Sequence, residues 1–333
     1  MTYIVPKAAW RIMLDGKDLT STMEPRLLSL SLSEKRGGEA DQLDISLSDQ
    51  DGRLAIPKPG ARLKLQLGFS RGTGVPIGLI DKGEFIVDSV EHSGAPDAIT
   101  LRARSADLSS DLRNRREQSW KDTTIGAVVA DIAGRNKLTP RVAGQLAGLA
   151  VKAIVQSRES DLALLRRLGK EHDAVATIKA GALIFAPVGS GMTASGKPIP
   201  PATIQRQTGD RHRYTIEKQD EATAVEAGYH DLATGKKKTV KAGSGKARKL
   251  SRTYASEAAA LAGAKAEQSR RARLPVKLSF ELAIARPDLY PERRITAEGF
   301  KPEIDATKWL IASVSHRLAK SGGFTTSLEM EAV

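Results

Sequence analysis

Cysteine is absent from this chain of 333 residues. That absence excludes a disulfide scaffold, a cysteine-ligated zinc site, an iron–sulfur cluster and a thiol nucleophile. Aromatic residues are also scarce, at 4%, so the core must be built mainly from Leu, Ile, Val and Ala. No apolar run approaches the roughly 18 residues of a membrane-spanning helix, and the first residues lack the basic and apolar regions of a signal peptide. We therefore predict a protein that is made in a cytoplasm and inserts into no membrane.

Acidic residues are outnumbered, with 39 Asp and Glu against 52 Lys and Arg, which gives a formal net charge of +13. The length predicts two or three domains, at ~150 residues each. A basic balance of this size favours acidic partners, which include acidic proteins and nucleic acids.

Residues 1–106 have the pattern of half-buried antiparallel strands. Apolar and polar residues alternate with a period of two, which places the apolar side chains on one face. Turn-forming Gly, Asp and Pro separate these runs. We predict a β-barrel domain whose core includes Leu28, Leu30, Leu32, Leu43, Ile45, Leu47, Leu63, Leu65, Leu67 and Phe69.

Residues 107–206 have a different pattern, and we predict a helical insertion followed by a linker. One helix is expected to begin at Thr123 or Thr124, because Ile125, Val128, Val129 and Ile132 follow helical spacing. A second helix is expected over residues 158–170, with acids in its first turn. A short strand over 182–185 and a connector rich in Gly, Pro and Ser follow.

Residues 207–333 return to the strand pattern, and we predict a second β-domain with an Ala-rich helix over 256–273. The stretch 235–252 carries eight basic residues and no acid, which favours a mobile loop or hairpin tip. It could be a solvated loop, a surface for an acidic protein, or a nucleic-acid contact, although no aromatic residue interleaves it to stack on bases. The candidate partner-binding residues are Lys236, Lys237, Lys238 and Lys241.

The two strand-rich regions share a weak internal repeat. Residues 85–92 and 309–316 both end in Ser-Val-x-His, and each is followed by an alternating strand, over 99–102 and 326–329. Upstream, Pro59, Arg62, Leu63, Gly68 and Phe69 match Pro291, Arg294, Ile295, Gly299 and Phe300 with a slip of one residue. The shared order favours a duplicated β-domain.

Motifs for catalysis and cofactor binding are incomplete. Residues 191–197 fit most of a phosphate-binding loop, but Pro198 stands where a Mg²⁺-ligating Ser or Thr is needed, and the neighbouring prolines exclude a helix there. The histidines, His92, His172, His212, His230 and His316, form no close ligand pair, and we interpret His92 and His316 as polar strand ends. Asp107, Asp111, Glu159 and Asp161 could supply a carboxylate pair, but as surface or helix-start acids they need no catalytic role. We predict no catalytic residue, no cofactor and no metal site.

Three segments in the middle of the chain resemble a known family. Residues 119–125 lead into 129–133 and 138–140, residues 156–162 precede 165–168, and residues 181–187 follow. Their order resembles the phage late control gene D family, the baseplate hub proteins of contractile tails, with relatives in R-type pyocins and other contractile injection particles.

This resemblance implies an α+β, predominantly β protein with two tube-like β-barrel domains, 1–106 and 207–333, around the insertion 107–206. It also implies a structural, non-enzymatic homotrimer that joins a hexameric tail tube to a trimeric spike and contacts other baseplate proteins. Such a protein assembles in the bacterial cytoplasm and ends in the baseplate of a phage tail or tail-like particle. The alternatives are a baseplate-associated cell-wall hydrolase and a basic nucleic-acid-binding protein.

Overall fold

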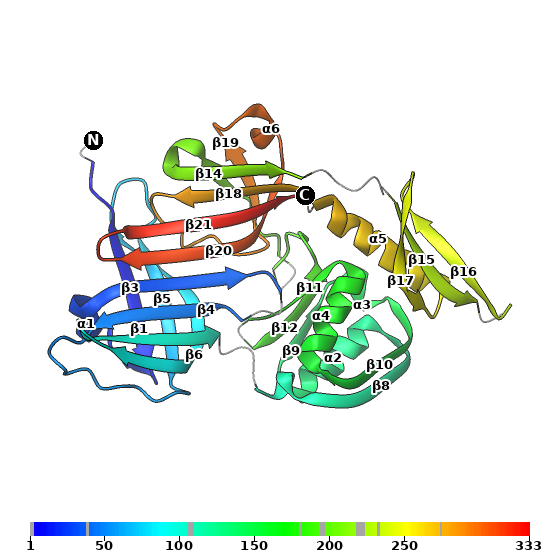
Figure 1. Ribbon diagram of the computed structural model, residues 1–333, viewed down its shortest axis with the longest axis horizontal. Coiled ribbons are helices and arrows are strands. Elements are labelled where there is room, and N and C mark those ends of the chain that lie inside the picture. Colours follow the sequence, from blue (N-terminus) through cyan, green and yellow to red (C-terminus); the bar gives the residue numbers. More distant parts are fainter. Residues whose placement is uncertain are drawn as a thin grey trace.

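The computed structural model describes residues 3–37, 40–105, 110–179, 181–193, 197–217, 224–231, 234–273 and 275–333. The fold is predominantly β, and a 13-stranded sheet runs through both ends of the chain. In Figure 1 this sheet forms the left half of the molecule, the middle segment lies below and to the right, and a smaller arm extends at the far right.

The first β unit is residues 3–105, and its strands curl around a core of Leu, Ile, Val and Phe side chains. Its sheet order is β3-β4-β7-β6-β5-β1-β2. Its elements are β1 (Lys7–Leu14), β2 (Lys17–Asp18), α1 (Thr20–Met23), η1 (Glu24–Arg26), β3 (Leu27–Lys35), β4 (Gln42–Ser48), β5 (Arg62–Arg71), β6 (Gly78–Ser93) and β7 (Ala98–Ser105).

The middle unit is residues 110–187 and has a separate core. The pair β10-β8 and the sheet β11-β12-β9 pack with its helices. Its elements are η2 (Ser110–Arg113), β8 (Arg115–Thr124), α2 (Ile125–Arg135), β9 (Thr139–Val142), α3 (Gly144–Ala147), β10 (Ala150–Ser160), α4 (Asp161–His172), β11 (Ala174–Lys179) and β12 (Ala182–Pro187).

The second β unit is residues 202–217 together with 275–333, around a core that includes Trp309 and Phe280. It has the sheet order β14-β18-β21-β20, with β19 beside β20 and β13 beside β19. Its elements are β13 (Ala202–Gln205), η3 (Arg206–Thr208), β14 (Gly209–Ile216), β18 (Val276–Leu282), β19 (Arg294–Glu298), α6 (Pro302–Asp305), β20 (Trp309–Ala319) and β21 (Gly323–Ala332).

The segment between β14 and β18 forms what we call the basic arm. Its three-stranded sheet has the order β16-β15-β17, and one long helix packs on that sheet (Figure 1). Its elements are β15 (Ala224–Asp231), β16 (Lys236–Ala242), β17 (Ala247–Tyr254) and α5 (Glu257–Arg273).

Several predictions about local structure are confirmed. Thr124 caps α2 by accepting a hydrogen bond from the backbone of Ala127, and the Ala-rich helix α5 ends at Arg273. The second predicted helix begins three residues late, at Asp161, because β10 continues to Ser160 and the Ser160 hydroxyl caps α4.

Other predictions need correction. The stretch 235–252 is no loop, because β16 and most of β17 lie within it. Leu28 is exposed, because the pairing of β3 with β4 shifts between Leu27 and Ser29 and turns Leu28 away from the core. The helical insertion is not confirmed, since strands β8 to β12 share the middle unit with its helices.

The predicted barrels are not confirmed either. Over the described ranges the strands of the two β units pair in one open sheet, whose main path runs from β14 to β2 while β19 and β13 branch from β20, and no closed barrel is found. The reason is that β3 pairs with β20 of the second β unit, which joins the two units through a shared strand pair.

Candidate functional site: strand edges, buried charges and the basic arm

The junction between the two β units is an antiparallel strand pair. β3 and β20 pair from Ser313↔Lys35 to Ala319↔Ser29. Side chains on the core face of both strands are fully covered at this junction, including Leu30, Leu32, Val314 and His316. The pairing therefore makes one continuous sheet from the two units, and Leu318 and Phe324 of the second unit pack into the core of the first.

A group of charged side chains is buried at this junction. Lys82 Nζ lies 2.6 Å from Glu34 Oε2, and both side chains are 4% exposed. His316 is completely buried, with Nε2 3.4 Å from Glu34 Oε2 and Nδ1 hydrogen-bonded to the Thr326 hydroxyl at 2.8 Å. Lys179, from β11 of the middle unit, lies 3.6 Å from Glu34 Oε1. One carboxylate thus ties together both β units and the middle unit.

Burial and neighbouring charges set the protonation of this group. Burial alone would raise the pKa of Glu34, but the His316 ring and the charges of Lys82 and Lys179 lower it to about 2. Burial lowers the pKa of His316 and of Lys82, and Glu34 opposes that effect in both. Nearby, burial raises the pKa of Asp41 to about 6, although Lys179 acts against it.

A β-bulge brings Lys82 into the junction. The register between β5 and β6 shifts so that Leu65 pairs with Gly83 and Gln66 with Asp81, which leaves Lys82 as the additional residue. Bulges re-aim side chains and increase local twist. The sequence signal for Glu34 was present, because it continues the core-facing alternation of Leu30 and Leu32. No simple pattern identifies Lys82.

Several strand edges in the described part of the chain have no such partner, and two of them belong to strands equivalent to those of the junction. One is the β14 edge opposite β18, and the other is residues 89–93 of β6 on the side away from β7. Core-facing side chains are open at both edges: the His92 side chain is 42% exposed and Ile216 is 65% exposed. Unpaired edges of this kind are templates for strand addition.

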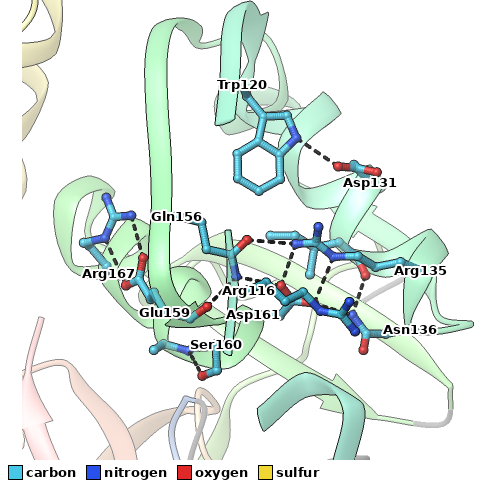
Figure 2. Close-up of polar contacts among 12 residues, drawn as sticks. Arg116, Trp120, Asp131, Arg135, Asn136, Gln156, Glu159, Ser160, Asp161 and Arg167 are labelled. Atoms are coloured by element: carbon cyan, nitrogen blue, oxygen red, sulfur yellow. Dashed lines mark hydrogen bonds and ion pairs between the residues drawn. The ribbon is translucent and has the colours of Figure 1, made fainter. Parts of the chain in front are cut away.

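The segment of the middle unit that carried the family resemblance centres on a buried carboxylate (Figure 2). Asp161 is 0% exposed and accepts hydrogen bonds from Arg135 at 2.5 and 2.9 Å, from Asn136 at 2.8 Å and from Gln156 at 2.9 Å. Arg116 lies 3.6 Å away. Asp161 therefore joins the end of α2 to β10 and the start of α4. A buried carboxylate with this many donors is a structural anchor.

This arrangement corrects the interpretation of the candidate acids. Asp161 does begin α4, as expected for a helix-start acid, but its side chain is fully buried and not on the surface, and neighbouring Glu159 is paired with Arg167 at 2.7 Å. Asp111 lies in η2 and contacts Asn114, and Asp107 is outside the described residues.

The histidines are not brought together. His316 is an interior residue of β20, three positions before its last residue, so our interpretation of it as a strand end is wrong. His92 does lie at the end of β6, 3.6 Å from Asp49. In the described part of the chain, no three His, Asp or Glu side chains are grouped so that they could hold a metal ion. The partial phosphate-loop motif, residues 191–197, includes residues 194–196, which are not among the described residues.

The four candidate lysines lie on β16 but on two different faces. The register pairs Tyr229 with Lys238 and His230 with Lys237. Because side chains alternate along a strand, Lys236 and Lys238 point to the α5 side, where Tyr229 packs, and Lys237 and Lys241 point to the opposite face. The lysines that the sequence groups together thus form no single patch.

Local partners hold part of this basic charge. Lys238 is paired with Asp231 at 2.6 Å, and the Lys241 ammonium donates to the Gly245 carbonyl at 2.7 Å. On the face opposite α5, Lys249 lies 3.6 Å from Glu226.

The chain matches the family model described as phage tail baseplate hub (GPD) over residues 42–322, and it belongs to that family. It is 41% identical to a probable baseplate hub protein of Escherichia phage 186 and 39% identical to that of Escherichia phage P2, in each case over 97% of this chain and 92% of the relative. Its fold is similar to that of a tail protein from Neisseria meningitidis MC58, with a TM-score of 0.68, 15% identity, and coverage of 98% of this chain and 96% of the other. Among the helices described, none has the length and apolar character needed to span a bilayer.

The Glu34→Gln variant tests the junction. It leaves the Lys82 ammonium buried without its counter-charge, so we expect unfolding in urea to show a loss of about 3–5 kcal/mol, as is typical for a broken buried ion pair. The double variant Glu34→Gln/Lys82→Met should recover most of that loss. Asp122→Asn is the matched control, because Asp122 and Lys152 form an exposed pair worth about 0–1 kcal/mol. A Glu34→Gln variant no less stable than this control would contradict the account.

The raised pKa of Asp41 gives a pH-dependent prediction. Between pH 4 and 6 the folded state holds a proton on Asp41 that the unfolded state has released, so stability falls as pH rises through this window. Asp41→Asn lacks that fall. We therefore expect its free energy of unfolding, relative to the parent, to rise by about 1–3 kcal/mol from pH 4 to pH 7, measured by urea titration. A difference that stays constant with pH would refute the burial of this carboxyl.

Proposed function

We propose that this chain is the structural adaptor of the hub, a homotrimer that joins a hexameric tail tube to a trimeric spike. The proposal further holds that the two β units are tube-like domains related by duplication. Three chains would then present six similar units toward the tube and threefold symmetry toward the spike. Closed symmetry of this kind solves the mismatch between a sixfold and a threefold partner.

The observation that carries the proposal is the shared strand order of the two units. The first unit has the order β1-β5-β6-β7-β4-β3, and the second has β13-β19-β20-β21-β18-β14. In chain order the equivalent strands occupy the same positions, with the basic arm inserted between β14 and β18. One difference is that β13 runs parallel to β19, whereas β1 is antiparallel to β5.

The registers agree as well. Val90 pairs with Leu101 in the β6–β7 hairpin, and Val314 pairs with Leu328 in β20–β21. Both hairpins have a register shift immediately before the repeated Ser-Val, at Asp88 and at Ala312. A bulge and a register retained together support common descent of the two units, because either is changed by a single inserted residue.

We propose the division of the chain on the same basis: a first tube-like unit over 1–106, an insertion with linker over 107–206 and a second tube-like unit over 207–333, with β13 contributing to the second unit. The proposed partners are the spike, the tube or its initiator and other baseplate proteins, reached by assembly in the bacterial cytoplasm. We propose a non-enzymatic role, which the match to the tail baseplate hub family supports.

We also propose that the basic arm docks on an acidic surface of a neighbouring assembly protein. Lys236, Lys237, Lys238 and Lys241 remain the proposed contacts. The arm projects from the sheet as a compact unit (Figure 1), so its charge is presented on ordered strands. Exposed ion pairs are individually weak, so several must act together.

The trimer has a direct test. The hub co-expressed with its spike protein should contain three hub copies per complex, by native mass spectrometry and light scattering. A stable complex with one hub chain would refute the adaptor. Cell-wall hydrolysis by the free chain would instead favour the hydrolase alternative, and steeply salt-dependent DNA binding would favour the nucleic-acid alternative.

The two faces of β16 allow a matched test of docking. Lys237→Gln/Lys241→Gln and Lys236→Gln/Lys238→Gln remove the same charge from opposite faces. We expect the first pair to lower particle yield more, because Lys238 is already engaged by Asp231. The loss should be largest at low salt and shrink at high salt, where screening already weakens these ion pairs. The melting temperature should change little in either variant. If even the fourfold variant assembles normally at every salt concentration, by electron microscopy and sedimentation, docking through these lysines is excluded.

A further inference from the structure

We propose that β14 of one copy pairs antiparallel with residues 89–93 of β6 in the next copy, in the register that joins β3 to β20 within one chain. This inference rests on the trimer proposed above and specifies its interface. The partner is a second copy of this chain, bound head to tail by strand addition.

The internal junction supplies the template. β20 occupies in the second unit the place that β6 occupies in the first, and β14 corresponds to β3. The turns that precede β5 and β19 contact the two strands in the same way: the Gly60 amide donates to the Val87 carbonyl of β6, and the Glu292 amide donates to the Ile311 carbonyl of β20. Toward its C-terminal end, on the same edge, β20 pairs with β3. The corresponding edge of β6, at residues 89–93, has no partner among the described residues. Each chain thus contains one complete junction, β3 with β20. It also contains the two unpaired strands, β14 and β6, that would form an equivalent junction between copies.

The register follows from the equivalent pairs. Leu30 pairs with Ile45, and Ile45 pairs with Leu101; His212 pairs with Phe280, and Phe280 pairs with Leu328. His212 therefore corresponds to Leu30, and Ile216 corresponds to Glu34. Transferring the β3–β20 pairs gives the intermolecular pairs Ser89–Glu217, Val90–Ile216, Glu91–Thr215, His92–Tyr214 and Ser93–Arg213.

The side chains at the two edges suit this pairing. On the core face, Ile216, which is 65% exposed in the single chain, would lie opposite Val90 and bury its apolar surface. On the other face, Arg213 and Glu217 would lie at the two diagonal positions around Glu91, so Glu91 gains one opposite-charge neighbour and one like-charge neighbour. None of the transferred pairs places like charges opposite each other.

The absence of cysteine makes the register measurable by cross-linking. The amide of Arg36 donates to Ala312 and that of Lys320 to Leu28, so Ser33 and Ser315 form a non-hydrogen-bonded pair between them. Such pairs have Cα atoms ~4.5 Å apart, within the range that a disulfide spans. Glu91 and Thr215 are the equivalent intermolecular pair.

The experiment oxidises the full chain, co-expressed with its spike protein, carrying Glu91→Cys and Thr215→Cys together. We expect a covalent trimer on non-reducing gels and nothing larger, because a head-to-tail ring closes. A mixture of the two single variants should give dimers, and neither single variant alone should do so. Ser33→Cys/Ser315→Cys is the intrachain control and should form its bond within the monomer. Glu91→Cys/Arg213→Cys, shifted by two residues, should give at least tenfold less cross-linked trimer.

The outcomes separate this inference from the function proposed above. A trimer by mass that does not cross-link at 91 and 215, or that cross-links equally at 91 and 213, overturns the pairing and leaves the adaptor standing. A monomeric hub on the spike overturns both.

A second variant tests the apolar contact. Ile216→Asp should lower the fraction of trimer at least tenfold while leaving the monomer folded. Ile56→Asp is the control, because Ile56 is 60% exposed in a loop, and it should change neither the fraction of trimer nor the folding of the monomer. Normal trimer formation by Ile216→Asp would overturn the inference.

Discussion

The antiparallel pairing of β3 with β20 is the contact on which the continuous sheet depends. It is fixed by a buried carboxylate, Glu34, held between Lys82 and His316. A slip of one residue in this pairing would move the Glu34 side chain to the opposite face of the sheet. The Lys82 ammonium would then be buried without a counter-charge. Buried ion pairs add little net stability, but breaking one is costly, so this group acts chiefly to specify the register. Because Lys179 joins it, the same charge also positions the middle unit.

The middle unit uses a similar device. Asp161 gathers donors from α2 and β10 at the start of α4, where a buried acid also suits the helix dipole (Figure 2). Away from these two buried carboxylates, the molecule exposes the unpaired edges of β6 and β14 and the charged strands of the basic arm. Unpaired strand edges are templates for pairing with another chain, which suits the assembly proposed for this hub.

Periodic segments were predictable from the sequence, and charged strands were not. The alternation at Leu63, Leu65 and Leu67 and the helical spacing after Thr124 led to the correct elements. β16 was predicted as a loop because its lysines obscure the period, although its pairing with β15 and its packing against α5 override that composition. A single bulge turned Leu28 outward. The buried charged group around Glu34 was not predicted from the sequence, because its members come from β3, β6, β11 and β20 and meet only in the folded structure.

The central claim is that three chains close into a ring of six β units through their strand edges. An electron cryomicroscopy map of the assembled tail tip tests it most directly. The account predicts threefold symmetry, with β14 of each copy hydrogen-bonded to β6 of the next, so that internal and intermolecular junctions alternate around one continuous sheet. A hub of different symmetry, or a ring in which those two edges lie apart, would contradict it.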